Sequence, residues 1–121
     1  MLFRSQGVDG LNGARFVAVS PDGRNVYVVS DEDALVVFGP DLAQRLSFFE
    51  AIFDGMDSVV DGLRGAAAVA VSPDGERVYV ASATDDALAV FDRDTDTGNL
   101  TFVTALFDGA GGIDEIGRAH V

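Results

Sequence analysis

The 121-residue sequence contains no cysteine. Disulfide bonds, thiolate metal sites and a cysteine nucleophile are therefore excluded. No window approaches about 18 uninterrupted apolar residues, so no membrane-spanning helix is predicted. The first six residues have neither a basic start nor an apolar core, and no signal peptide is visible in them.

Basic side chains are also scarce. Eight arginines and lysines stand against 20 acidic residues, which gives a formal net charge of −12. Such a surface repels phosphate backbones and anionic lipids, so nucleic-acid binding is not predicted. It favours a cation or a basic partner. The alternative is that the acids only keep a chain with 48% hydrophobic residues in solution.

An internal repeat is the main feature that is present. ARFVAVSPDG at 14–23 matches AAAVAVSPDG at 66–75, with a period of 52 residues between Ser20 and Ser72. Upstream, VDGLNGA matches VDGLRGA at the same offset. Downstream, the matched pairs are RNVYVVS with ERVYVAS, ALVVF with ALAVF, and RLSFFEAIFDG with NLTFVTALFDG.

Each repeat contains four short apolar runs that are separated by turn signals. In the second repeat the runs are 66–72, 77–82, 87–92 and 100–107. Valine, tyrosine and phenylalanine dominate them, which predicts β-strands. The Ser-Pro-Asp-Gly sequences have proline second and glycine fourth, which is typical of a type I turn that closes a hairpin.

The predicted strands are apolar on both faces. Val69 and Val71 point to one face of the sheet, and Ala68 and Ala70 point to the other. A sheet with one face in water would alternate apolar and charged residues instead. Four-stranded antiparallel sheets that are each covered on both sides make a β-propeller. We therefore predict an all-β fold of propeller blades, present here as a partial propeller.

The repeat also predicts the domain organisation. Residues 1–13 are the end of a preceding blade, 14–65 are one blade with its connecting loop, and 66–114 are the next blade. Residues 115–121, EIGRAHV, break the pattern and match the in-frame translation of a sequencing-library adapter. We interpret them as an artefact of environmental (metagenomic) or genomic reads.

Two blades alone would leave two apolar sheet faces in water, and repeat units generally need neighbours. The partners that we expect first are therefore further blades of the same chain, or other copies that assemble into a ring.

The blocks VAVSPDGRNVYVVS and VAVSPDGERVYVAS resemble the YVTN-type repeats of bacterial lactonase-like seven-bladed propellers. The resemblance covers residues 8–109 and continues through ALAVFDRDTDTGNLTFV. It implies a complete ring of roughly 360 residues. The family includes 6-phosphogluconolactonase-like enzymes, and the same repeat occurs in surface and binding proteins.

Many aspartates fall in connections that share one rim of a propeller. Clustered carboxylates are the ligands that Ca²⁺ prefers, whereas aspartate is also an ordinary turn residue. Both interpretations stay open for this acidic rim. Its candidate residues are Asp31, Asp33, Asp54, Asp57, Asp61, Asp85, Asp86 and Asp108.

Three other features carry possible site chemistry. Asp92-x-Asp94-x-Asp96 resembles the start of an EF-hand loop, but Val103 stands where the twelfth-position glutamate would be, so a hairpin turn is favoured. GAGGID at 109–114 resembles a single calcium-binding repeat. Arginines near the rim could bind an anionic sugar acid or pair with aspartates; they are Arg4, Arg15 and Arg64.

Two functions follow from these observations. The first is a binding or structural scaffold, with an extracytoplasmic location favoured. The alternative is a 6-phosphogluconolactonase-like lactonase whose catalytic residues lie largely in blades outside this sequence. Ser20 and Ser72 have no histidine partner, because the one histidine, His120, lies in the adapter-like segment. A Ser-His-Asp arrangement is therefore absent from this sequence.

Overall fold

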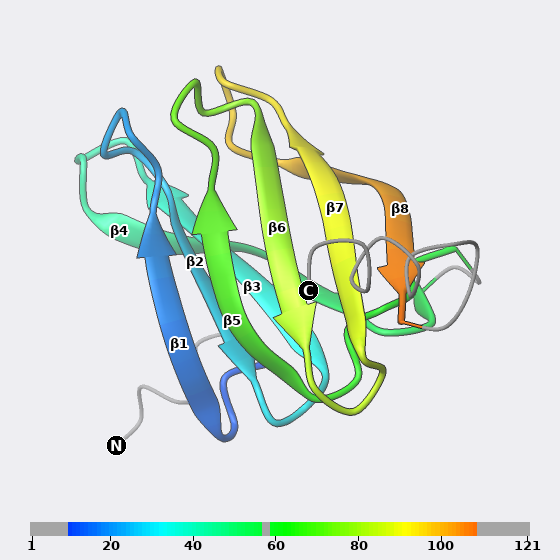
Figure 1. Cartoon of the computed structure of the whole chain (residues 1–121). Coiled ribbons are helices and arrows are strands. Elements are labelled where there is room, and N and C mark those ends of the chain that lie inside the picture. Colours follow the sequence, from blue (N-terminus) through cyan, green and yellow to red (C-terminus); the bar gives the residue numbers. More distant parts are fainter. Residues whose placement is uncertain (1–9, 57–58, 109–121) are drawn as a thin grey trace.

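The computed structural model describes residues 10–56 and 59–108, which form two four-stranded antiparallel sheets (Figure 1). Within these residues no helix is long and apolar enough to cross a membrane. The first sheet consists of β1 (Ala14–Val19), β2 (Val26–Ser30), β3 (Ala34–Pro40) and β4 (Leu46–Phe53). The second consists of β5 (Ala66–Val71), β6 (Arg77–Ser82), β7 (Ala87–Arg93) and β8 (Leu100–Phe107).

Both sheets have consecutive strands as neighbours, in the orders β1-β2-β3-β4 and β5-β6-β7-β8. The predicted all-β fold of four-stranded blades is therefore confirmed, and we call the two sheets the first and second blades. Their Ser-Pro-Asp-Gly turns are alike. Gly23 N donates to Ser20 O at 2.9 Å, and Gly75 N donates to Ser72 O at 2.9 Å.

The hydrophobic core lies between the two blades. One face of the first blade packs against one face of the second, and β5 is the second-blade strand nearest to β1 and β2 (Figure 1). Burial of these apolar side chains is the main stabilising contribution. The fully buried large side chains of this interface are Tyr27, Val29, Leu35, Val37, Leu63, Val78, Val80 and Phe91.

Each blade also has an outer face that is only partly covered. In the first blade Val17 and Val19 are 56% and 58% exposed. In the second blade Leu88 and Leu106 are exposed on the face that points away from the first. These two surfaces are the ones that neighbouring blades cover in a complete propeller, so the architecture is that of a partial ring.

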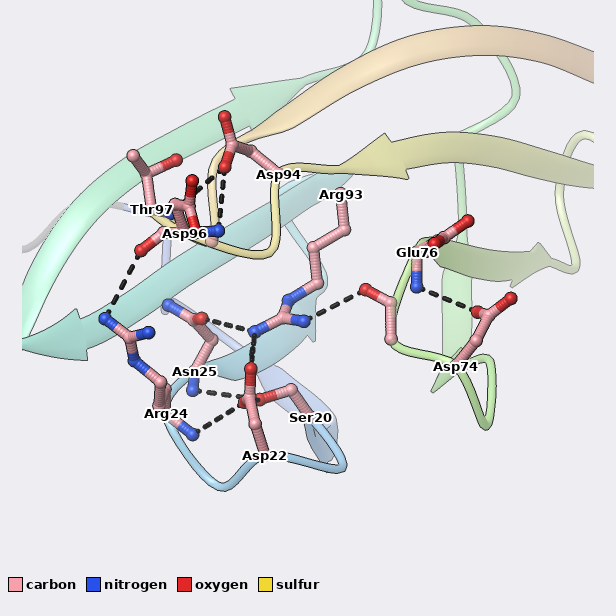
Figure 2. Close-up of polar contacts among 12 residues, drawn as sticks. Ser20, Asp22, Arg24, Asn25, Asp74, Glu76, Arg93, Asp94, Asp96 and Thr97 are labelled. Carbon is pink, nitrogen blue, oxygen red and sulfur yellow. Dashed lines mark hydrogen bonds and ion pairs between the residues drawn. The ribbon is translucent and has the colours of Figure 1, made fainter.

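A buried arginine ties the two blades together at the edge that carries the Ser-Pro-Asp-Gly turns (Figure 2). Only 1% of the Arg93 side chain, at the end of β7, is exposed. Its guanidinium donates to Asp22 Oδ2 at 3.0 Å and to Asn25 Oδ1 at 2.7 Å in the first blade. It also donates to Tyr27 Oη at 2.8 Å, and that hydroxyl donates to Gly98 O at 3.0 Å.

The electrostatics of this network keep its charges in place. A hydrogen bond from the Ser20 hydroxyl, then one from the Arg24 amide, lowers the pKa of Asp22, and Arg93 lowers it further. Burial raises the pKa of Tyr27. Burial alone would lower the pKa of Arg93, but its bonds to Asp22 and Tyr27 outweigh that effect and raise it. The arginine is therefore charged, and the tyrosine is neutral, throughout the physiological range.

We expect Arg93→Met to lower the free energy of unfolding by about 2–3 kcal/mol, because the substitution leaves buried acceptors without their donor. Urea unfolding at a fixed protein concentration measures this loss. The matched control is Arg77→Met, which removes an ion pair to Asp92 whose side chains are about half exposed. An effect of Arg77→Met as large as that of Arg93→Met would contradict the assigned role of the buried network.

The lowered pKa of Asp22 also determines how the free energy of unfolding changes with pH. A carboxylate with a depressed pKa in the folded state contributes stability above its unfolded pKa, and this contribution is lost as the pH falls through the folded value. The wild-type chain should therefore lose stability progressively from about pH 5 downwards. Asp22→Asn should show a shallower loss over the same range in the same unfolding assay.

Candidate functional site

The rim that carries the predicted acidic residues lies at the lower edge of Figure 1. The β2–β3 loop, the β6–β7 loop and the β4–β5 connection all meet there, whereas the Ser-Pro-Asp-Gly turns lie at the opposite edge. The antiparallel strand order causes this separation, because alternate connections leave a sheet at opposite ends. The acidic rim is therefore a surface assembled from both blades.

Two of the rim aspartates stabilise the loops themselves. Asp33 has a φ of 60°, in the left-handed region that aspartate tolerates better than most residues. Its backbone carbonyl accepts the Asp54 N–H at 3.0 Å, and its carboxylate accepts the Gly65 N–H at 2.9 Å. Asp86 has a φ of 51° and accepts the Asp108 N–H at 2.9 Å in the same way. Asp33 and Asp86 thus join the outer strand of each blade to its β2–β3 or β6–β7 loop.

Three other aspartates converge into an acidic triad. Asp54, Asp61 and Asp85 place carboxylate oxygens within 4.8 Å of one another. Backbone amides of the β4–β5 connection hold each carboxylate, with Leu63 N donating to Asp54 at 3.1 Å and Gly62 N to Asp61 at 2.9 Å. Asp85 accepts from Arg64 N at 3.2 Å. The triad supplies three hard oxygen donors, which is part of the six to eight that Ca²⁺ takes.

The remaining predicted rim residues are not part of this triad. Asp31 forms an ion pair with Arg15. Asp86 and Asp108 line an open cavity of about 440 Å³ on the outer face of the second blade, beside Ser82. Asp57 lies outside the described residues.

Arg64 differs from the other arginines of the described part of the chain. The side chains of Arg15, Arg24, Arg45, Arg77 and Arg93 all make an ion pair or a hydrogen bond. Within residues 10–56 and 59–108 no such contact involves the guanidinium of Arg64. The residue is exposed, and its backbone amide donates to Asp85 of the triad. This cation can bind an anionic group without breaking an existing pair. Arg4, the third arginine predicted near the rim, is not among the described residues.

The EF-hand-like segment is a hairpin turn between β7 and β8. Asp94 Oδ1 accepts the amides of Asp96 at 2.8 Å and Thr97 at 3.2 Å. Gly98 N donates to Asp94 O at 2.7 Å, and Asp92 pairs with Arg77 instead of facing this turn. The glycine-rich segment 109–114 and the adapter-like segment 115–121 lie outside the described residues.

Sequence reasoning does not find the Arg93 network. The repeat aligns Arg93 with Pro40, so the periodicity gives no sign of a conserved cation at that position. The difference between the two repeats is itself the signal that could have pointed to it, because an unpaired arginine at the end of an apolar strand needs a partner.

Comparison with known proteins places this architecture in one class, the seven-bladed propellers of lactonase type. The family described as "Lactonase, 7-bladed beta-propeller" matches residues 4–108, so the chain belongs to it. No protein of curated function matches the chain in sequence.

Several solved structures are similar to the chain. A periplasmic gluconolactonase from Pseudomonas aeruginosa, PpgL, is 31% identical with a TM-score of 0.65, over 84% of this chain and 27% of that one. A putative 6-phosphogluconolactonase from Bacteroides uniformis is 24% identical with a TM-score of 0.67, over 85% of this chain and 29% of that one. Kuenenia stuttgartiensis hydrazine synthase is 26% identical with a TM-score of 0.59, over 79% of this chain and 24% of that one.

The chain therefore spans less than a third of the length of these structures. Proteins that are named for different activities share its fold, so the fold alone does not select an activity.

Gly65 provides a test of how the rim is held. Its φ is +73°, and an added Cβ would lie 2.2 Å from Thr84 Oγ1 and 2.6 Å from the Thr84 backbone nitrogen. Gly65→Ala should therefore lower the free energy of unfolding by about 3 kcal/mol, from strain and overpacking together. Gly55→Ala is the matched control, because its φ is +82° but its Cβ would meet nothing within 4 Å. Its expected loss is about 1 kcal/mol, and equal losses would refute the close approach at Gly65.

Proposed function

We propose that the full-length protein is a lactonase that hydrolyses a sugar-acid lactone of the gluconolactone type, and that this chain supplies two of its blades. Water adds to the lactone carbonyl and the ring C–O bond breaks, which yields a hydroxy acid. The observation that carries the proposal is the family match over residues 4–108. The 31% identity to a protein described as a periplasmic gluconolactonase supports it.

The family match also changes the order of the two functions that the sequence leaves open. From the residues alone, a binding or structural scaffold ranks first. Similarity to a gluconolactonase and to a putative 6-phosphogluconolactonase favours the lactonase instead. The scaffold stays as the alternative, and failure of the full-length protein to turn over any lactone would favour it.

Within the proposed enzyme, the acidic rim contributes to substrate binding. The exposed guanidinium of Arg64 can bind an anionic group of the substrate or of the acid product. The carboxylates of Asp54, Asp61 and Asp85 lie on the same rim, where Asp85 accepts the Arg64 backbone amide, and they can accept hydrogen bonds from sugar hydroxyls. The groups that activate water belong to other blades of the ring.

Lactone turnover by the full-length protein tests this function. Glucono-δ-lactone and 6-phosphogluconolactone are the substrates, and the acid released above the spontaneous rate is measured at constant pH. Because Arg64 meets an anion, we expect Arg64→Gln to raise KM for the phosphorylated lactone about tenfold and to change KM for the neutral lactone little. Arg45→Gln, an exposed arginine at the opposite rim, is the matched control and should leave both substrates unaffected. Equal effects of the two substitutions would contradict an anion site at Arg64.

Calcium binding is a second candidate role, because Asp54, Asp61 and Asp85 converge. Two of the carboxylates come from the β4–β5 connection and one from the β6–β7 loop, and backbone amides hold all three. We expect a dissociation constant on the order of 1 mM. Isothermal titration with CaCl₂ measures it. Asp61→Asn should weaken binding, whereas Asp96→Asn, which removes one charge at the opposite rim, should not. Absence of binding heat in the wild-type protein would dismiss the metal role and leave the lactonase proposal standing.

We also infer an extracytoplasmic location, on the strength of the periplasmic relative in Pseudomonas aeruginosa. A leader peptide in the full-length coding sequence would support this location, and its absence there would argue against it.

A further inference from the structure

The second blade has, at its outer face, a turn equivalent to the one that binds Arg93 in the first blade. The repeat aligns Asp74 with Asp22, and Tyr79 with Tyr27. The two aspartates are held in the same way. Asp22 Oδ1 accepts Ser20 Oγ at 2.5 Å and a backbone amide at 3.0 Å, and Asp74 Oδ1 accepts Ser72 Oγ at 2.6 Å and a backbone amide at 2.9 Å. The second turn is therefore preformed for the contact that the first one makes.

The two turns differ in what occupies them. In the first blade, the carboxylate and the tyrosine hydroxyl are both bound by Arg93. In the described part of the chain, Asp74 has no cation within ion-pair distance and the Tyr79 hydroxyl has no hydrogen bond. Hydrogen bonds from Ser72 and then from the Glu76 amide lower the pKa of Asp74, so its carboxylate is charged at neutral pH.

Charges around the second turn favour a cation more strongly than those around the first. Four positions at or near each turn are equivalent in the repeat. In the first blade they carry one carboxylate and one guanidinium, whereas in the second blade they carry three carboxylates and one guanidinium. That guanidinium belongs to Arg77, and Asp92 already binds it at 2.5 Å. The sets are Asp22, Arg24, Asn25 and Gly39 in the first blade, and Asp74, Glu76, Arg77 and Asp92 in the second.

We propose that Asp74 and Tyr79 form a docking site for the guanidinium of an arginine that a neighbouring blade carries at the end of its third strand. The established Arg93 contact between the first and second blades is the template for this interface. The apolar surface of the same outer face, which has Leu88 and Leu106 toward the acidic rim, packs against the same neighbour.

The occupant is specified by its chemistry. A second copy of this chain would present Pro40 at the position of Arg93, because the repeat aligns these two residues. A second wild-type copy therefore does not complete the site. The partner that completes it is a blade with arginine at the position of Arg93. The site thus selects which blade follows the second, and this role does not depend on the proposed lactonase activity.

A gain of function in the 121-residue chain tests the proposal. Pro40→Arg gives the first blade of one copy the arginine that the second blade of another copy would bind. We expect the head-to-tail association constant, measured by sedimentation velocity, to rise at least about tenfold over wild type, as for a charge-assisted hydrogen-bonded pair. Adding Asp74→Asn should remove the gain. Adding Asp96→Asn, the matched charge removal, should keep it.

Two outcomes would overturn the proposal: a Pro40→Arg chain that associates no more strongly than wild type, or a gain that survives Asp74→Asn. Circular dichroism checks that each variant folds, and arginine already occupies the equivalent strand end in the second blade. A second measurement needs no variant. The repeat that follows in the full-length coding sequence should carry arginine about 53 residues after Arg93, the spacing of the aligned third strands. Any other residue there, or no following repeat, would refute the site.

Discussion

Packing between apolar sheets governs this structure. Each blade has two apolar faces, so a blade buries its side chains only by lying against another blade. This chain contains one such interface, in which Val29 and Leu35 of the first blade and Val80 and Phe91 of the second belong to one buried apolar cluster. The connections that lead into the blades must also lie close to the sheets. A Cβ on Gly62 would approach the Ala105 Cβ to 2.8 Å, so only glycine lets that segment pass.

The two edges of the blade pair differ in how their polar groups are hydrogen-bonded, and they therefore have different roles. At the edge of the Ser-Pro-Asp-Gly turns, a buried guanidinium joins the blades through direct side-chain contacts (Figure 2). At the acidic rim, backbone amides hold the carboxylates of Asp54 and Asp85 while leaving them accessible. One edge therefore fixes how the blades sit together, and the other presents charged groups on that rigid support.

Local chemistry explains how well the strands can be predicted. The predicted runs 66–72 and 87–92 correspond to β5 at Ala66–Val71 and β7 at Ala87–Arg93, because turn residues mark where each strand must stop. The loop that each rim aspartate occupies is predictable for the same reason. Their convergence is not, because the triad joins a carboxylate of the β6–β7 loop to two from the β4–β5 connection, across distances that no local pattern encodes.

The sequence by itself determined the repeat, the all-β blades, the turn types and the apolar character of both sheet faces, since these depend on residues close together in the chain. Only the tertiary structure decided that Arg93 is buried against Asp22 and Tyr27, which precede it by 71 and 66 residues. It also decided that Asp54, Asp61 and Asp85 meet while Asp31 pairs with Arg15. The physical reason is that the partner of a charged side chain is set by how two blades dock, and docking is a property of whole faces rather than of any one segment.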